Sequence, residues 1–200
     1  MEMNLIFIGP QGSGKGTQAK IISEKLNLNH ISTGDLIRNA PAEFASELQS
    51  YINIGNLVPD DVIIKLLKVE LSKNPEGFIL DGFPRNLNQA RELDVITEIE
   101  KVVEISISDE EAIRRISSRL NCKNCGEIFN EITRPPENRG KCDNCSQVLF
   151  QRDDDNPQAI KKRLQVYHAD TEPILEHYDS IKIDGEQSID KVTQDILEGL

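Results

Sequence analysis

Near its start the chain reads Gly9-Pro10-Gln11-Gly12-Ser13-Gly14-Lys15-Gly16-Thr17. An apolar run, residues 5–8, precedes this segment, and an amphipathic one, residues 17–26, follows it. A strand, a glycine-rich loop and a helix in this order predict a phosphate-binding loop. Glycine permits positive φ, so successive backbone N–H groups can surround an anion, and the start of the helix adds partial positive charge. The alternative is a glycine-rich turn without a ligand.

The residues around Lys15 follow the Walker A pattern Gly-x-x-x-x-Gly-Lys with one departure. Lys15 would neutralise the β and γ phosphates of a nucleotide. The pattern then requires Ser or Thr as a magnesium ligand, whereas this chain has Gly16 and places the hydroxyl one residue later, at Thr17. We therefore expect the metal to be held mainly by phosphates and water.

Composition restricts the possible classes of protein. The 200 residues suit one domain with insertions, and an apolar content of 38% is ordinary for a soluble chain. Residues 1–4 lack the basic region of a signal peptide, and no apolar run reaches membrane-spanning length, so we expect a cytoplasmic location and no membrane partner. The formal net charge of −11 disfavours nucleic acid as a partner and makes a cluster of arginines more informative.

Apolar runs alternate with amphipathic segments along the chain, which predicts an α/β fold with a parallel sheet covered by helices on both faces. The expected strands are residues 5–8, 29–32, 77–80, 102–107 and 181–184. The expected helices are residues 17–26, a short one opening at Thr33, 42–54, 62–72, 88–96, 108–119, one from Pro157 and one after Ser188. Thr33 is expected to be an N-cap, and Ser108 to Glu111 a capping box.

Four cysteines interrupt this alternation. Cys122-x-x-Cys125 and Cys142-x-x-Cys145 are separated by sixteen residues, a spacing typical of zinc sites. Four thiolates suit a closed, structural site, which would replace the apolar core that so short a segment lacks. Free thiols and two disulfides remain alternatives. A nucleic-acid-binding zinc ribbon is a further one, although the surrounding residues form no basic stripe.

Several motifs together resemble the adenylate kinase family, in its form with a zinc-bearing lid. They are the glycine loop through Gln18, Ser32-Thr33-Gly34-Asp35, Asp81-Gly82-Phe83-Pro84-Arg85 and Arg152-x-Asp154-Asp155, in the family's order, with Arg163 at the place of its last active-site arginine. The resemblance implies a three-layer P-loop nucleoside monophosphate kinase fold. Its parts would be a core (residues 1–31, 59–118 and 156–200), a helical AMP-binding insert (32–58) and a zinc-binding lid (119–155).

The resemblance also implies an activity: transfer of a phosphoryl group from ATP to AMP with magnesium, giving two ADP, in a monomer. The cations acting on that group would be Lys15, Arg85, Arg119, Arg152 and Arg163. The ATP-binding residues would be Gly12, Ser13, Gly14, Lys15, Gly16, Thr17, Arg119, Ile128, Phe129 and Gln187. The AMP-binding residues would be Thr33, Arg38, Leu57, Val58, Gly82, Arg85, Gln89, Arg152 and Arg163. Asp81 would orient magnesium through water, and Asp154 and Asp155 would hold the closed lid.

The chain departs from the family in three places. Proline and glycine in the loop are shifted, since the order here is Pro10-Gln11-Gly12; the AMP-binding insert is a few residues short; and Gln187 stands where lysine is common. Because the family uses the backbone carbonyl at this last position, we expect little change there. Arg115 is a further candidate contact to the nucleotide.

Other interpretations remain open. A kinase for UMP and CMP would differ in its acceptor base, which Thr33 and Gln89 would choose. A P-loop ATPase or GTPase switch would hydrolyse its nucleotide without a phosphate acceptor. A zinc-dependent module would bind nucleic acid instead. The three acidic residues 153–155 could instead supply charge to a helix N-terminus. Residues expected at the surface or in structural roles are Arg114, Arg134, Arg139, His30, His168 and His177.

Overall fold

The main sheet consists of five parallel strands. The structure is a computed structural model, and it describes residues 3–40, 48, 51, 56–73 and 76–200. The strands are β1 (Asn4–Ile8), β2 (Asn29–Ser32), β3 (Phe78–Asp81), β4 (Lys101–Ser106) and β8 (Ser180–Asp184), in the spatial order β2-β3-β1-β4-β8. All five predicted strands are confirmed, with ends shifted by no more than one residue. Apolar runs in the sequence identify most of these strands, whereas β2, Asn29–Ser32, is mostly polar.

Side chains of the central strand point alternately to two apolar layers. Leu5 and Phe7 pack with α1 (Lys15–Leu26) and α8 (Ile189–Gly199), whereas Ile6 and Ile8 belong to the layer on the opposite face. All four side chains are at most 2% exposed. Burial of each such side chain contributes about 1.5–3 kcal/mol, so a strand apolar on both faces holds the two layers together.

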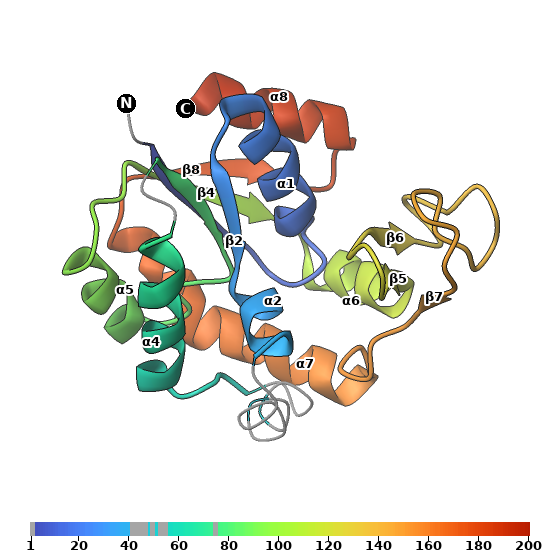
Figure 1. Cartoon of the computed structure of the whole chain (residues 1–200), viewed down its shortest axis with the longest axis horizontal. Coiled ribbons are helices and arrows are strands. Elements are labelled where there is room, and N and C mark those ends of the chain that lie inside the picture. Colours follow the sequence, from blue (N-terminus) through green and yellow to red (C-terminus); the bar gives the residue numbers. More distant parts are fainter. Residues whose placement is uncertain (1–2, 41–47, 49–50, 52–55, 74–75) are drawn as a thin grey trace.

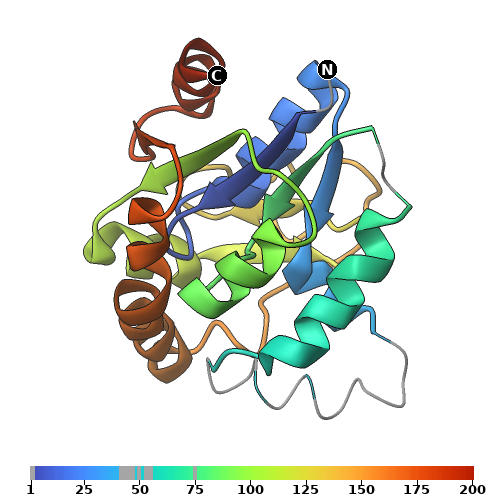
Figure 2. The ribbon, with the colours of Figure 1, turned by 90° about the vertical axis from the view of Figure 1, so that its left-hand side faces the viewer.

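The opposite face of the sheet is covered by the remaining core helices (Figures 1 and 2). They are α2 (Thr33–Arg38), α4 (Asp60–Leu71), α5 (Leu87–Asp94), α7 (Pro157–Val166) and the two short turns η1 (Tyr167–Thr171) and η2 (Glu172–Glu176). Buried residues of this layer include Ile37, Leu67 and Leu93. The arrangement is a parallel sheet with helices on both faces, as the sequence pattern predicts, and it agrees with the three-layer fold that the resemblance implies.

Strand register brings the polar segments to one edge of the sheet. Asp81, the last residue of β3, pairs with Phe7 of β1 and with Ser32 of β2. The segments that follow these three strands therefore emerge side by side. Along the chain, β2 and β3 are added on one side of β1, and β4 and β8 on the other. The point where the strand order reverses in this way is where ligands bind in open α/β sheets.

A second sheet follows α6 (Asp109–Ser117). It contains β5 (Arg119–Cys122), β6 (Ile128–Asn130) and β7 (Leu149–Phe150), antiparallel in the order β6-β5-β7. Its small core is formed by Phe129, Leu149 and two cysteines, with Leu120 against them. Figure 1 shows this unit, here called the lid sheet, on the side of the molecule away from α5.

Two expectations about helices need correction, and a third concerns residues that are mostly outside the described part of the chain. Ser32, not Thr33, is the N-cap of α2: its Oγ accepts a hydrogen bond from the backbone N–H of Asp35 at 3.3 Å. Ser32 ends a strand and is already extended, as an N-cap must be, so Thr33 becomes the first helical residue. α6 ends at Ser117, before Arg119. The helix expected at 42–54 falls mostly outside the described residues.

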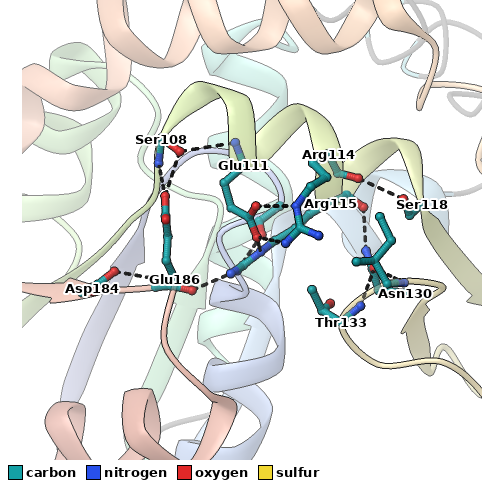
Figure 3. Close-up of polar contacts among 12 residues, drawn as sticks. Ser108, Glu111, Arg114, Arg115, Ser118, Asn130, Thr133, Asp184 and Glu186 are labelled. Atoms are coloured by element: carbon teal, nitrogen blue, oxygen red, sulfur yellow. Dashed lines mark hydrogen bonds and ion pairs between the residues drawn. The ribbon is translucent and has the colours of Figure 1, made fainter.

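The capping box predicted for α6 is only half formed. Ser108 Oγ accepts from the backbone N–H of Glu111 at 3.3 Å, as predicted. The backbone N–H of Ser108 donates to Glu186 instead of Glu111, because the Glu111 carboxylate binds Arg114 and Arg115. Glu186 thus ties the start of α6 to the turn after β8, as Figure 3 shows.

Within the described part of the chain, no helix combines the length and the apolar character needed to cross a membrane.

Candidate nucleotide-binding site

A cavity of about 780 Å³ lies at the carboxyl edge of the main sheet, bounded by the glycine loop, α2, the segment after β3 and the lid sheet. Its wall includes every residue predicted to contact a nucleotide or magnesium: Gly12, Ser13, Gly14, Lys15, Gly16, Thr17, Thr33, Arg38, Leu57, Val58, Asp81, Gly82, Arg85, Gln89, Arg119, Ile128, Phe129, Arg152, Arg163 and Gln187. Asp154 also lines it, whereas Asp155 is buried behind the wall. Residues far apart in the sequence therefore share one chamber.

The glycine loop is shaped for an anion. Gly14 precedes α1 with φ of 92°, a left-handed conformation that L side chains rarely adopt. At Gly12 a Cβ would lie 3.0 Å from the carbonyl oxygen of Ala112, so a side chain would also crowd α6. The loop then delivers the N-terminus of α1 to the cavity wall, where free N–H groups and the helix dipole favour phosphate.

Lys15 and Asp81 form the polar floor of the cavity. Burial, aided by Arg85 and the other cations nearby, lowers the pKa of Lys15 to about 8, although Asp81 acts in the opposite direction. Burial alone would raise the pKa of Asp81, but His30 and Lys15 outweigh it and hold that pKa below its usual value. Nε2 of His30 lies 3.6 Å from Oδ2 of Asp81, which is an electrostatic contact beyond hydrogen-bond distance. His30, expected to be structural or exposed, is thus part of the cavity wall.

Four arginines surround the same floor: Arg85, Arg119, Arg152 and Arg163. Burial and the charge of Arg163 lower the pKa of Arg85, whose Nε donates to the carbonyl of Gly82 at 2.7 Å. Burial, together with Arg119 and Arg38, lowers the pKa of Arg152 to about 10. Burial is the larger cause of both lowered pKa values and repulsion among the cations is the second, and an anion bound between the arginines would offset both.

Two aspartates neutralise part of this charge. Nε of Arg119 donates to Asp155 at 2.9 Å, and a second nitrogen of the same guanidinium contacts the other carboxylate oxygen. Arg163 pairs with Asp154, and its Nη1 also donates to Gln11 at 3.3 Å. The aspartates belong to the segment that leads from the lid sheet to α7. Arg163 of α7 contacts Asp154 and, at 3.9 Å, Asp155, and so connects this segment to the core, whereas Arg119 connects it to the start of the lid sheet.

The end of the cavity near α2 and α5 is less charged. Thr33 is 1% exposed, and its hydroxyl donates to the carbonyl of Gly82 at 2.9 Å. That hydroxyl can therefore only accept from a ligand. Gln89 is 2% exposed with its amide engaged at both ends, and Arg38 pairs with Asp35 at 2.6 Å. This end offers a few directed hydrogen-bonding groups, as base recognition requires.

The opposite end lies under the lid sheet. Ile128 and Phe129 line it, and Glu127 accepts from Lys20 of α1 and from Arg134, each at 2.8 Å. Arg134 is exposed, as expected, and it also lines the cavity, with its guanidinium over the ring of Phe129. Its partners Glu127, Ile128 and Phe129 lie in or next to β6, a few residues earlier in the chain.

Arg115 connects α6 to the glycine loop (Figure 3). Its Nε pairs with Glu111 at 2.5 Å, and its Nη1 donates to the carbonyl of Gly185 at 2.9 Å. The carbonyl of Gly12 lies 3.5 Å from the same nitrogen. Arg115 therefore braces the loop while forming part of the cavity wall. The amide of Gln187, also on that wall, is held by Asp184 and Asp195.

The four cysteines gather into one cluster. Their Sγ atoms lie within 4.8 Å of one another, with Cys122–Cys145 at 3.3 Å and Cys125–Cys142 at 3.5 Å. A tetrahedral zinc site with Zn–S bonds of about 2.3 Å has sulfur–sulfur edges of about 3.8 Å. The thiols are not joined as disulfides. The cluster fits a zinc ion, which would stabilise the lid sheet.

Several residues that hold the site were not predicted. They are Gln11, Asp35, Asp60 and Glu111, which bind Arg163, Arg38, Gln89 and Arg115 respectively. The pairs Asp35–Arg38 and Glu111–Arg115 have helical spacing and could have been found by that signal. Asp60 and Gln89 lie on different helices, and no periodicity relates them.

The fold, the glycine loop and the ring of cations define a P-loop kinase that acts on nucleotides. The family model described as "Adenylate kinase" matches residues 7–183. The chain is 42% identical to an adenylate kinase of Caldicellulosiruptor bescii over 99% of both chains. It is 44% identical to one of Methanocella arvoryzae over 97% of this chain and 96% of the relative. It is 46% identical to an adenylate kinase of Methanothrix thermoacetophila over 88% of this chain and 86% of the relative.

The chain therefore belongs to the adenylate kinase family. It is a nucleoside monophosphate kinase, a phosphotransferase.

Proposed function

We propose that this protein transfers the γ-phosphoryl group of ATP to AMP, reversibly and with magnesium, giving two molecules of ADP. An oxygen of the AMP phosphate attacks the γ-phosphorus while the bond to the β-phosphate oxygen breaks. The observation that carries the proposal is the meeting of Lys15 and four arginines in one cavity of a chain whose formal net charge is −11. Two nucleotide anions repel each other, and this cluster offsets that repulsion.

Positioning and charge would supply the catalysis. The acceptor phosphate is largely ionised at neutral pH, so the reaction needs no general base. Arginine is suited to the task because its planar fork keeps its charge and binds phosphate oxygens in pairs. Lys15, Arg119, Arg152 and Arg163 would hold the donor and the group in transfer, with Arg85 and Arg38 on the acceptor phosphate.

Magnesium fits the donor set at the floor of the cavity. Asp81 offers a carboxylate beside Lys15, and magnesium commonly takes one or two carboxylates together with phosphates and water. When bound, the ion would neutralise charge on the donor phosphates and fix their geometry. Asp81 would orient the ion through water. Thr17 would add no direct ligand, in agreement with the departure at Gly16.

The two nucleotides would bind at opposite ends of the cavity. ATP would occupy the end under Ile128 and Phe129, and AMP the end with Thr33, Leu57 and Val58. Asp154 and Asp155 would hold the lid closed through Arg163 of the core and so exclude water from the transferred group. We also propose the division into core (1–31, 59–118, 156–200), AMP-binding insert (32–58) and lid (119–155), a structural zinc, and action as a monomer.

A coupled assay of ADP formation tests the proposal. The purified protein is supplied with ATP, magnesium and, separately, AMP, GMP, UMP or CMP. AMP should be the preferred acceptor, and Lys15→Ala should lose at least about a hundredfold in kcat without a change in folding, because it removes a charge from the transition state. If AMP were a poor acceptor beside UMP and CMP, the adenine assignment would be wrong. Fast ATP hydrolysis independent of any acceptor would favour an ATPase.

A further inference from the structure

The carboxylate of Asp60 holds three side-chain amides. Asp60 is the first residue of α4. Its Oδ1 accepts from Nε2 of Gln89 at 2.6 Å and from Nδ2 of Asn86 at 3.0 Å, and its Oδ2 accepts from Nδ2 of Asn88 at 2.8 Å. Burial opposes ionisation, but these three bonds outweigh it and keep the pKa of Asp60 below its usual value. At neutral pH the group is therefore a carboxylate, which can only accept hydrogen bonds.

The other end of the Gln89 amide meets a group that can only donate. The backbone N–H of Arg85 donates to Oε1 of Gln89 at 2.8 Å. With a pure acceptor at Nε2 and a pure donor at Oε1, the amide has one favourable orientation. If it turned over, its N–H would face the N–H of Arg85 and its oxygen would face the Asp60 carboxylate. Both contacts would then be repulsive, in a side chain that is 2% exposed.

The oriented amide still has capacity for a ligand. Nε2 has a second N–H and Oε1 has a second lone pair, and Gln89 lines the cavity whereas Asp60 does not. The pairing edge of adenine presents an amino donor at C6 and an acceptor at N1. A 6-oxopurine such as hypoxanthine presents the reverse, an acceptor at C6 and a donor at N1. An amide that cannot turn over distinguishes these two patterns.

We propose that Asp60 is a specificity-determining positioning residue, which fixes the polarity of the Gln89 amide so that the acceptor site takes 6-aminopurine and rejects 6-oxopurine nucleotides. The inference rests on the proposed function, because it requires the acceptor base to lie against Gln89. Asp60 touches no substrate and acts only through Gln89. Rejection arises because the wrong base would leave buried groups unpaired or opposed.

The test compares Asp60→Asn with a matched control, Asp61→Asn. Asparagine can accept or donate at this position, so it permits either orientation of Gln89. Asp61 lies in the same first turn of α4, but its side chain is 69% exposed, and among the described residues its ion-pair partner is Lys65, at 3.5 Å. Both variants lose one negative charge from the same helix start. For each protein, kcat and KM are measured with AMP and with IMP as acceptors, and KM is measured for ATP.

We expect the ratio of kcat/KM for AMP over IMP to fall at least about tenfold in Asp60→Asn, the equivalent of one unpaired hydrogen-bonding group. The ratio should stay within twofold of the unmodified protein in Asp61→Asn, and KM for ATP should not change in either. General damage to α5 would slow both acceptors equally. An unchanged ratio in a folded Asp60→Asn protein would therefore overturn the inference.

The unmodified protein gives a second measurement in case Asp60→Asn does not fold. A trans-hydrogen-bond NMR coupling between Nε2 of Gln89 and Cγ of Asp60 should be present with and without AMP. Its absence would refute the inference. The proposed function fails separately: no transfer to AMP refutes both, whereas good transfer to AMP and IMP alike refutes only the role of Asp60.

Discussion

Gly16 and Asp81 are so close that a Cβ at position 16 would lie 3.0 Å from Oδ2 of the aspartate. The missing hydroxyl of the Walker A pattern thus has a physical explanation. The space that Ser or Thr would occupy at this position adjoins the Asp81 carboxylate, which is also the group placed to orient magnesium. Because Gly16 has no side chain, the Asp81 carboxylate can approach the phosphate loop.

Gly16→Ala should therefore lower activity although alanine favours helix. The added methyl group would push the Asp81 carboxylate by a few tenths of an ångström, and we expect kcat to fall about tenfold, since small misplacements near reacting groups are costly. Steady-state kinetics with ATP and AMP measure this. Gly16→Ser serves as the comparison: if it were fully active, the crowding explanation would be incorrect, because serine carries the same Cβ.

Nucleotide binding should depend on pH through Lys15. Burial lowers the pKa of Lys15 to about 8, and the phosphates of ATP would restore the charge. ATP should therefore bind with proton uptake, and its affinity should fall as pH rises above about 8. Calorimetry in buffers of different ionisation enthalpy measures the uptake. Lys15→Met should abolish it, and equal uptake in that variant would assign the proton to another group.

The same pKa sets the sign of a stability effect. Between pH of about 8 and 10.5 the unfolded chain keeps the Lys15 proton that the folded protein has lost. Without nucleotide, raising pH through this window should stabilise the protein relative to Lys15→Met. Urea unfolding of both proteins at matched pH values measures the difference. A constant difference across the window would contradict the lowered pKa.

The contact between Lys20 and Glu127 should slow release of ATP. It joins α1 to the lid at 2.8 Å, but Lys20 is 55% exposed, so it is worth at most about 1 kcal/mol. Lys20→Ala should speed dissociation of ATP by no more than about fivefold at low salt, and the difference should vanish at high salt. Stopped-flow displacement measures the rate. Lys25→Ala, on the same helix, is the control, and an equal effect there would rule out the pairing.

Removal of zinc should destabilise the lid. Apart from its cysteines, the lid sheet has only a small apolar core. A metal bound by the four cysteines would therefore supply much of the folding energy of the lid. We expect chelation, or Cys142→Ser, to lower Tm by about 5–10 °C, the equivalent of a few kcal/mol in a chain of this size. Differential scanning calorimetry with metal analysis tests this, and restored zinc should reverse the chelated case. Unchanged melting after verified metal loss would show that the site is not structural.

Local signals were sufficient for much of the fold. The apolar run 5–8 could be identified as a central strand because both of its faces are buried, and the glycine loop because its residues are consecutive. Helix starts were less certain. Ser32 and Thr33 are both good N-cap residues by type, and only the extended backbone of Ser32 in the structure shows which of them is the cap. Glu186 replaced Glu111 in the capping box because another element competed for that carboxylate.

The sequence by itself determined the alternation of strand and helix, the phosphate loop and the cysteine pairs, since each depends on neighbours within a few residues. The set of cations is implied by the resemblance to the adenylate kinase family. Only the tertiary structure decided which groups hold those side chains in place. Asp60 reaches Gln89, Glu127 reaches Lys20 and Gln11 reaches Arg163 across different elements. Such contacts depend on how the elements pack in space, and a hydrogen bond over that distance leaves no periodic trace in the chain.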